Sequence, residues 1–241
     1  MPQEITASPC CLPPETMRIQ ILTLFPNTCE GILSQGILGR ARKRGSIEIQ
    51  ALDLRQWGVG KHHVTDEAPY GGGPGMVMKI EPYASALADL CKPHTRTVLM
   101  STHGRRFQHT IAYEYSLEKE VVLLCGHYEG VDQRVSDHLV DDVISVGDYV
   151  LTSGVLPALV FVDAVARLVP GVLGNVDSAG QESFVAGLLD YPTYTRPETF
   201  RGWEVPSILL SGNHAKIRKW RAVAALELTR ERRPDLLDSP P

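Results

Sequence analysis

Long apolar runs, a secretion signal and paired cysteines are all missing from this chain of 241 residues. The longest apolar stretch is interrupted by Asp163 and Arg167, so it falls short of the about 18 residues that cross a bilayer. The N-terminus lacks the basic region and apolar stretch of a signal peptide. The five cysteines are odd in number and lack metal-ligand spacing, which favours reduced thiols. These absences predict a cytoplasmic protein with no membrane partner.

Two common nucleotide-binding motifs are missing as well. No Gly-x-Gly-x-x-Gly opens a helix and no Gly-Lys-Ser/Thr occurs, so neither a dinucleotide pocket nor a P-loop is supported. The glycine run Gly71–Gly75 offers backbone amides to an anion, although a tight turn explains it equally well. The loops that follow three short apolar runs of the chain lack a basic residue at their shared apex, apart from Arg105 and Arg106, which favours an uncharged or zwitterionic ligand over a triphosphate.

The chain also carries little net charge, formally −4 at pH 7, which argues weakly against a nucleic-acid partner. The charge is nevertheless uneven. Seven basic and only two acidic residues lie between His214 and Arg233, which gives this segment about +5 and the rest of the chain about −9. A polyanion site and a solvated helix face both account for such a run. Trp220 within it favours RNA, because aromatic and arginine side chains together suit unstacked bases.

Three segments repeat one pattern, in which a short apolar run leads into a polar loop that contains glycine. The segments are TVLMSTHGR, VVLLCGHYEG and VISVGDYVLTSG, and helical patterns follow them at about residues 107–118, 131–139 and 156–168. Strands that alternate with helices predict an α/β fold with a mostly parallel sheet. Ligands of such sheets bind outside the carboxyl ends of the strands, where all three loops fall.

The stretch from Gly147 to Gly174 combines the third of these loops with an almost wholly apolar helix. Asp163 and Arg167 are the only charges of that helix, and their four-residue spacing puts them on one face. A buried helix that keeps an arginine near its end, directly after a glycine loop, indicates a ligand site rather than plain core.

The pattern predicts two domains with an extension and a linker. We expect a disordered extension at residues 1–16, an α/β domain at 17–174, a linker at 175–187 and a helical, basic domain at 188–241. Within the α/β domain we further expect a strand from Met17 that Pro26 stops, a helix at Ile32–Arg44, a strand at Ile47–Leu52 and a long loop at His62–Met78.

A set of motifs carries a resemblance to a known family. The motifs are MRIQILTLFP, YGGGPGMVM, LCGHYEGVDQRV, SVGDYVLTSGVLPALVFVDAVARLVPGVLG, ESF, LLDYPTYTRP, SGNHAKIRKWR and RRPDLL. They follow one another in the family's order from Met17 to about Leu237. The chain closely resembles the bacterial tRNA (guanine-N1)-methyltransferases of the TrmD type, in the SPOUT superfamily.

The resemblance implies a C-terminal deep trefoil knot in the mostly parallel α/β domain, followed by a small helical domain. It also implies a homodimer with an active site shared between subunits. The knot of one subunit would bind S-adenosylmethionine in a bent form, and the C-terminal domain of the other would hold tRNA. The product would be 1-methylguanosine at tRNA position 37, beside the anticodon.

By the same resemblance, ten residues are expected to contact the cofactor: Leu99, Ser101, Gly126, Tyr128, Glu129, Val146, Tyr149, Leu151, Gly154 and Pro157. Adenine needs backbone donors and acceptors between apolar walls, which residues of these types supply. Without the resemblance, Leu99, Val146 and Leu151 are better explained as core residues.

Catalysis requires a base for the proton on guanine N1 and a cation or donor for the charge that develops toward O6. The resemblance implies Glu182 as the base and Arg167 as the stabilising cation. The family usually has aspartate where this chain has Glu182, and its common glutamate is replaced by Val155. Those departures motivate one alternative, a non-catalytic RNA-binding relative, and a knotted methyltransferase with another RNA target is a second.

The tRNA contacts implied by the resemblance lie beside the glycine run and in the SGNHAKIRKWR segment. They are Asp66, Tyr70, Ser211, Asn213, His214, Arg218 and Arg221. The family resemblance further implies stimulation by Mg²⁺, for which the sequence identifies no site.

Overall fold

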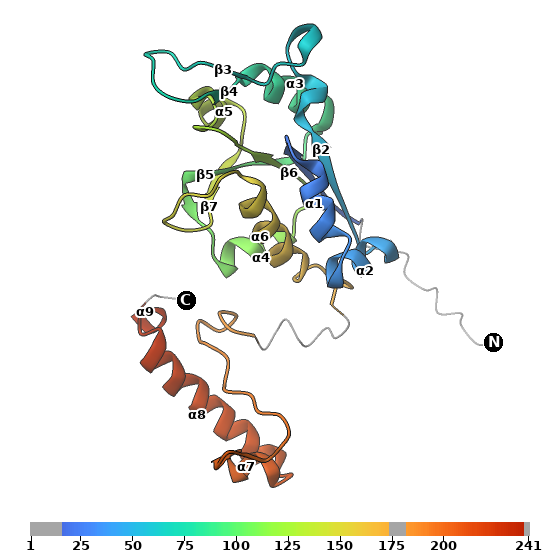
Figure 1. Cartoon of the computed structure of the whole chain (residues 1–241). Coiled ribbons are helices and arrows are strands. Elements are labelled where there is room, and N and C mark those ends of the chain that lie inside the picture. Colours follow the sequence, from blue (N-terminus) through green and yellow to red (C-terminus); the bar gives the residue numbers. More distant parts are fainter. Residues whose placement is uncertain (1–15, 174–181, 239–241) are drawn as a thin grey trace, which may run out of the picture. The chain divides into compact units, whose positions relative to one another are not determined.

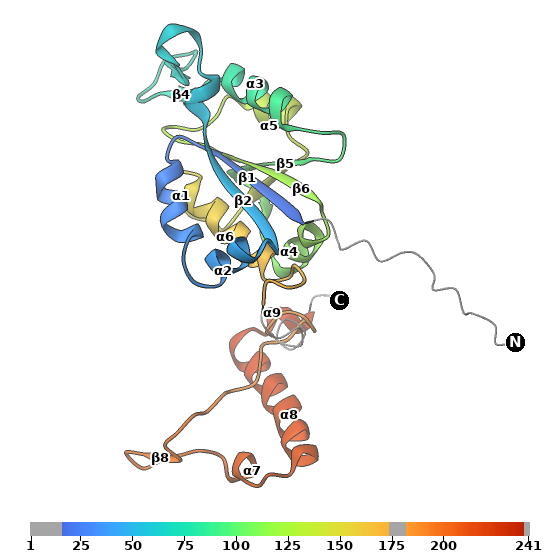
Figure 2. The same cartoon turned by 90° about the vertical axis from the view of Figure 1, so that its right-hand side faces the viewer.

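The computed structural model describes residues 16–173 and 182–238, so nearly all of the expected extension at residues 1–16 lies outside the described part. The chain divides into two compact units, Met1–Gly174 and Asn175–Pro241. Figures 1 and 2 show the elements of each unit from two sides. Within the described residues, no helix is both long enough and apolar enough to span a bilayer.

The first unit is built on one sheet of five strands. They are β1 (Met17–Thr23), β2 (Ile47–Asp53), β5 (Arg96–Arg106), β6 (Glu120–Cys125) and β7 (Asp142–Ser145). The spatial order is β2-β1-β6-β5-β7, and every neighbouring pair is parallel. The expectation of a mostly parallel α/β sheet is confirmed, and the carboxyl ends of the three loop-bearing strands lie at one edge.

Helices cover both faces of this sheet (Figure 1). The helices of the unit are α1 (Pro26–Leu33), α2 (Gly36–Arg44), α3 (Ile80–Leu90), α4 (His109–Ser116), α5 (Gln133–His138) and α6 (Val155–Ala166), with short 3₁₀ turns at Leu54–Trp57 and Gly60–His62. The residues of α1, α2, α4 and α6 belong to one buried cluster and those of α3 and α5 to another.

Alternation along the strands produces these two cores. Val121 and Leu123 of β6 face the α6 side, whereas Val122 and Leu124 face the α3 side, and all four are fully buried. Successive strand residues point to opposite faces, so a strand covered on both sides reads as a continuous apolar run. Each fully buried side chain of this kind contributes about 1.5–3 kcal/mol to folding.

The expected helix at Ile32–Arg44 is wrong in its bounds. The structure has two helices there, because Gly36 adopts φ +58° and interrupts the right-handed path after Leu33. A left-handed residue cannot continue a right-handed helix, and glycine adopts it at little cost. Pro26, expected to stop the first strand, does so by opening α1.

The segment expected as a long loop at His62–Met78 contains a small ladder. Strands β3 (Asp66–Glu67) and β4 (Val77–Met78) pair antiparallel, and the glycine run forms the connection between them. The helix α3 that follows was not anticipated from the sequence. Its bounds are consistent with the proline Pro82, which lies within the first turn, where no backbone N–H is required.

The second unit contains three helices and one hairpin among its described residues. The elements are β8 (Thr199–Phe200), β9 (Trp203–Glu204), α7 (Ser207–Leu210), α8 (His214–Arg232) and α9 (Asp235–Asp238). Helix α8 is capped by Asn213, whose side-chain oxygen accepts a hydrogen bond from the Lys216 N–H. Thr229 is the one residue of α8 that is buried, so most of its basic surface is accessible in this unit.

Candidate functional site

One cavity lies at the carboxyl ends of β5, β6 and β7. Its wall comes from the three glycine loops that follow these strands and from the first turn of α6. The ten residues expected to contact a cofactor all line it: Leu99, Ser101, Gly126, Tyr128, Glu129, Val146, Tyr149, Leu151, Gly154 and Pro157. Three loops that are far apart in the sequence thus form a single concave surface.

The first wall is an outward loop in β5. Met100 and Arg105 both stand opposite Ile144 of β7, so the residues between them have no strand partner. Ser101, Thr102 and His103 occupy this excursion and line the cavity. The chain then rejoins β7 at Gly104, where an added Cβ would lie 2.4 Å from the Ile144 nitrogen. Only glycine permits so close an approach of the two backbones.

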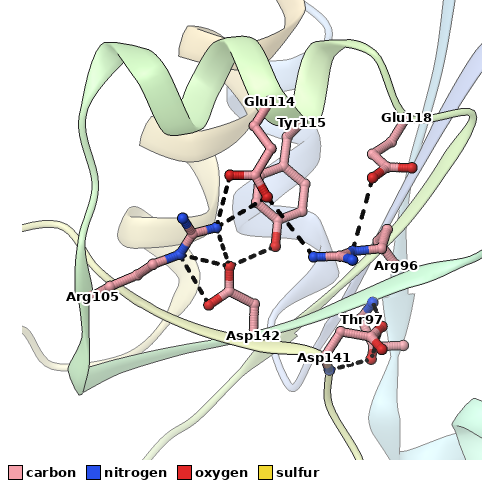
Figure 3. A network of polar contacts seen from close by, with 8 residues as sticks. All are labelled: Arg96, Thr97, Arg105, Glu114, Tyr115, Glu118, Asp141 and Asp142. Carbon is pink, nitrogen blue, oxygen red and sulfur yellow. Dashed lines mark hydrogen bonds and ion pairs between the residues drawn. The ribbon is translucent and has the colours of Figure 1, made fainter. Parts of the chain in front are cut away.

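A network of charged groups holds the end of this excursion (Figure 3). The Arg105 guanidinium donates to Asp142 at 2.9 Å and to Glu114 at 3.1 Å, and the Tyr115 hydroxyl donates to Asp142 at 2.8 Å. The bond to Asp142 raises the pKa of Arg105, and burial followed by the same carboxylate raises the pKa of Tyr115. The guanidinium is therefore charged and the phenol neutral at physiological pH. Tyr115 also packs edge-on against Phe161 of α6, with ring centroids 5.0 Å apart.

The start of β5 is bonded to the residue directly before β7. Asp141 accepts hydrogen bonds from the Thr97 N–H at 2.8 Å and from the Thr97 hydroxyl at 2.9 Å. Arg96 lies 3.9 Å from both Glu114 and Glu118 (Figure 3). The strand is thus held by polar contacts on both sides of the cavity-lining excursion, at Arg96 and Thr97 before it and at Arg105 after it.

The second wall depends on two glycines. The Gly154 N–H donates to the Gly126 carbonyl at 2.8 Å, and a Cβ on Gly154 would lie 2.8 Å from the Cys125 Cα. This contact seats the first turn of α6 directly on the end of β6. The Tyr83 hydroxyl, fully buried, donates to the Cys125 carbonyl at 2.9 Å and supports the wall from the opposite face.

The rim around Glu129 explains the glycine run. A Cβ on Gly75 would lie 2.5 Å from the Glu129 Cγ, so the run passes close to the cavity rim. The Glu129 N–H donates to the Met76 carbonyl at 3.0 Å, and the Met78 N–H donates to the Gly130 carbonyl at 2.9 Å. These contacts support the turn explanation of the glycines and fix the β3–β4 ladder beside the cavity.

Two of the residues expected to contact tRNA lie in the β3–β4 ladder or in its connection. Asp66 stands opposite Met78 in the β3–β4 pair and is therefore held near the cavity rim. Tyr70 lies in the connection and is completely exposed. A rigid acidic residue and a solvated aromatic ring thus project from one structure next to the cavity.

The two expected catalytic residues do not lie in this cavity wall. Arg167 caps the C-terminal end of α6, where its N–H donates to the Asp163 carbonyl at 3.2 Å. At 1.5 Å per residue, it stands about 15 Å along the helix from Pro157, the α6 residue that lines the cavity. Glu182 belongs to the second unit. Neither residue lines the cavity, so an active site that uses both would extend beyond it.

Glu182 heads an ordered turn, although residues 175–187 were expected to form a linker. The Ser183 hydroxyl accepts from the Asp190 N–H at 2.8 Å, and the Phe184 N–H donates to the Leu188 carbonyl at 2.7 Å. The Leu189 N–H donates to the Thr229 hydroxyl at 3.0 Å, which ties the turn to α8. Residues 182–187 therefore have defined structure, and the rest of the expected linker, 175–181, lies outside the described residues.

The expected tRNA contacts of the second unit have different environments. Asn213 caps α8, and the Ser211 hydroxyl donates to the Ile208 carbonyl at 2.7 Å, so both shape the turn before the helix. His214 and Arg218 are exposed. Arg221 is partly buried, with its guanidinium 4.5 Å from the centroid of the Tyr191 ring. Arg221 thus has a packing role whether or not it meets RNA.

Several cavity residues were missed by the sequence reading: Thr102, His103, His127, Gln133, Ser145 and Ser153. Thr102, His103, His127 and Ser153 lie beside expected residues in the same three loops, so treating each loop as a whole would have found these four. Ser145 ends β7 and Gln133 begins α5. His127 packs edge-on between Phe25 and Tyr128, with centroid distances of 5.0 and 4.5 Å. Among the described residues, no group of three or more His, Cys, Asp or Glu is placed to hold a metal ion.

The fold and the cavity define a class of protein, an α/β protein with a cavity formed by loops at the carboxyl ends of parallel strands. A family model described as tRNA (Guanine-1)-methyltransferase TrmD matches residues 17–239. The chain therefore belongs to the TrmD family.

Individual relatives agree with the family match, and each carries the name tRNA (guanine-N(1)-)-methyltransferase. A protein of Geobacter sp. (strain M21) is 54% identical over 224 residues, which cover 92% of this chain and 90% of that protein. One from Geobacter sulfurreducens is 51% identical over 223 residues, with 92% and 91% covered. One from Staphylococcus epidermidis is 50% identical over 226 residues, with 93% and 92% covered.

Proposed function

We propose that this protein transfers a methyl group from S-adenosylmethionine to N1 of the guanosine at tRNA position 37. The observation that carries the proposal is the single cavity lined by all ten residues expected to contact the cofactor. Family membership supplies the reaction class, since its relatives are named tRNA (guanine-N(1)-)-methyltransferases.

The cavity has the chemistry that S-adenosylmethionine requires. Leu99, Val146 and Leu151 supply apolar surface for an adenine ring, and the backbone around Gly126 and Gly154 leaves no room for side chains at the wall. The cavity holds about 220 Å³. Pockets that enclose a whole drug-sized ligand run to about 300–1,000 Å³, so part of the cofactor would lie outside this cavity. When bound, it supplies the electrophilic methyl group.

The polypeptide around the cavity is proposed to form the deep trefoil knot of the SPOUT superfamily. The excursion of β5 and the close seating of α6 on β6 are consistent with chain segments that pass tightly around one another. Such threading is an exception to the general absence of knots. Its benefit here is three loops held rigidly around one small ligand.

Glu182 is proposed to remove the proton from guanine N1, and Arg167 to stabilise the charge that develops toward O6. A neutral guanine N1 still carries its proton and is a poor nucleophile, so proton removal must accompany methyl transfer. A cation near O6 lowers the energy of the transition state more than that of the substrate. Glu182 stands at the start of an ordered turn, whose hydrogen bonds hold the backbone that carries this side chain.

The active site is proposed to be shared between the subunits of a homodimer. Arg167 stands at the far end of α6 from the cavity of its own subunit, and Glu182 lies in the other unit of the chain. A partner subunit would bring both residues to a cavity that neither lines on its own. Asp66, Tyr70 and the SGNHAKIRKWR segment with Ser211, Asn213, His214, Arg218 and Arg221 are proposed to hold the tRNA. Magnesium is proposed as a stimulating ion without an assigned site, and the cytoplasm as the compartment.

Tritiated methyl transfer to two tRNA transcripts tests the reaction directly. One transcript carries guanosine at position 37 and the other adenosine there, with magnesium present in both reactions. We expect labelling of the guanosine transcript alone, at N1 after nucleoside digestion. Cofactor binding without transfer to either transcript would instead assign the chain to non-catalytic RNA binders, and label in ribose or in another RNA would indicate a different methyltransferase.

A further inference from the structure

We propose that the hairpin at residues 199–204 is a stacking platform for an unpaired nucleobase of the tRNA substrate. This aromatic hairpin pairs β8 with β9 and projects outward from the rest of its unit in Figure 2, where it is labelled β8. The inference rests on the proposed function and extends it to a contact outside the SGNHAKIRKWR segment.

The hairpin is held in shape by its turn. Arg201 and Gly202 connect the two strands, and their φ angles are +54° and +83°. Positive φ at both central residues is the mark of the tight turns whose twist matches paired strands. Gly202 adopts this conformation readily, whereas a non-glycine residue such as Arg201 does so at a cost. The result is a short, pre-organised projection.

Two aromatic rings lie side by side on this projection. Phe200 and Trp203 stand directly opposite each other in the strand pair, and their ring centroids are 6.0 Å apart. Their exposed fractions are 53% and 69%. The Arg201 guanidinium lies 5.2 Å from the centroid of the Phe200 ring, which leaves the indole available to a partner. An exposed pair of rings with an arginine beside it is an unusual use of apolar surface in a free domain.

Nucleobases suit this surface better than a charged partner does. The hairpin carries Arg201 and Glu204 and therefore no net charge, which gives it little attraction for phosphate. Aromatic side chains and arginine planes stack on unpaired bases, and each such contact strengthens binding without reading the base sequence. The basic helix α8 of the same unit offers the complementary electrostatic contacts. One surface would hold the RNA by charge and the other by stacking.

These two contributions differ in their response to salt. Contacts with phosphate release counterions and weaken steeply as salt rises, whereas stacking does not. Filter binding of the guanosine-37 transcript at about 50 and 200 mM salt separates them. We expect Trp203→Ala in the full chain to weaken binding about 10-fold, by the same factor at both salt concentrations. Arg218→Ala, on the exposed face of α8, should lose more affinity at low salt than at high salt.

A conservative variant and a fluorescence signal distinguish loss of stacking from misfolding of the Trp203→Ala protein. Trp203→Phe retains a ring and should bind tRNA within about 3-fold of the unchanged protein, because phenylalanine also stacks. The tryptophan fluorescence of the unchanged protein minus that of Trp203→Phe reports on the indole alone. It should be quenched when the transcript is added.

The inference is overturned by unchanged binding of Trp203→Ala at both salt concentrations, or by Trp203 fluorescence that does not respond to tRNA. A change of the oligomeric state of Trp203→Ala in sedimentation would overturn it too, by assigning the rings to a second copy of this chain. Wild-type protein that neither binds nor methylates tRNA would contradict the proposed function itself, which is a distinguishable result.

Discussion

The Arg105 guanidinium is bonded to the Asp142 carboxylate across the point where β5 rejoins β7, at 2.9 Å. The bond closes the excursion whose residues Ser101, Thr102 and His103 line the cavity. A contact between two residues that do not line the cavity thus holds one of its walls in place.

Replacing Arg105 with methionine should weaken cofactor binding while the fold is retained. Without the guanidinium, Asp142 and Glu114 lose their shared partner, and the excursion shifts relative to the other two loops. Misplacement of a positioning group by about 1 Å costs up to about 100-fold, so we expect calorimetric affinity for S-adenosylhomocysteine to fall by about 10- to 100-fold. Arg42→Met is the matched control, since Arg42 makes an equivalent pair with Glu30 away from the cavity at 2.9 Å. Equal effects of the two substitutions would refute this role for Arg105.

Gly154→Ala should damage both stability and the cavity. The added methyl group would lie 2.8 Å from the Cys125 Cα and the Gly126 nitrogen, which are backbone atoms that cannot move aside. Overpacking of this kind costs about 1–3 kcal/mol of unfolding free energy, measurable by urea denaturation. Gly31→Ala is the control, because nothing lies within 4 Å of its added Cβ in α1. That change should stabilise the protein by about 0.5–1 kcal/mol, and a stability loss there equal to that of Gly154→Ala would contradict the steric argument.

Glu182→Gln should lower kcat by about 100- to 10,000-fold and leave affinity for the cofactor unchanged, since an amide cannot accept the N1 proton. Single-turnover methyl transfer to the guanosine-37 transcript measures this. Glu198→Gln, an exposed glutamate of the same unit, should retain full activity. Glu182→Asp should retain activity because it restores the usual side chain of the family. Normal turnover by Glu182→Gln would remove this residue from the role of base.

The buried thiols predict how stability depends on pH. Burial raises the pKa of Cys29 to about 11, and burial also raises the pKa of Cys125. Between the ordinary cysteine pKa and about 11, the unfolded chain releases the Cys29 proton while the folded chain keeps it. The free energy of unfolding therefore falls progressively as pH rises through this interval. Cys29→Ala should show a shallower loss of unfolding free energy above pH 9 than the unchanged protein, an interval set by the ordinary value of about 8.5. If the free energy of unfolding fell equally steeply with pH in both proteins, Cys29 would not be a source of the pH dependence.

The same protonation makes both residues poor nucleophiles. Only the thiolate reacts with alkylating reagents, and little of it forms below the raised pKa. Peptide mass spectrometry after iodoacetamide treatment at pH 8 should find Cys29 and Cys125 unmodified in folded protein and modified after unfolding. Rapid labelling of either residue in folded protein would contradict their burial.

The sequence by itself determined the class of fold and the place of the ligand site. Apolar runs such as Val121–Leu124 are continuous because both sheet faces are covered, and that pattern is readable without coordinates. The glycine loops after β5, β6 and β7 lie at one edge because parallel strands place all their carboxyl ends together. The bounds of α4, α5 and α6 differ from their expected ranges by at most two residues at either end.

Only the tertiary structure decided which residues meet. Arg105 reaches Asp142 and Gly154 reaches Gly126 because the strand order β2-β1-β6-β5-β7 differs from the chain order. Periodicity records which face a residue occupies but not which distant strand lies beside it. The break between α1 and α2 escaped the sequence reading because glycine adopts either sign of φ, and the sequence does not tell which glycine is left-handed, as Gly36 is with φ +58°. Local patterns therefore predicted the three loops, and packing between distant segments made them one cavity.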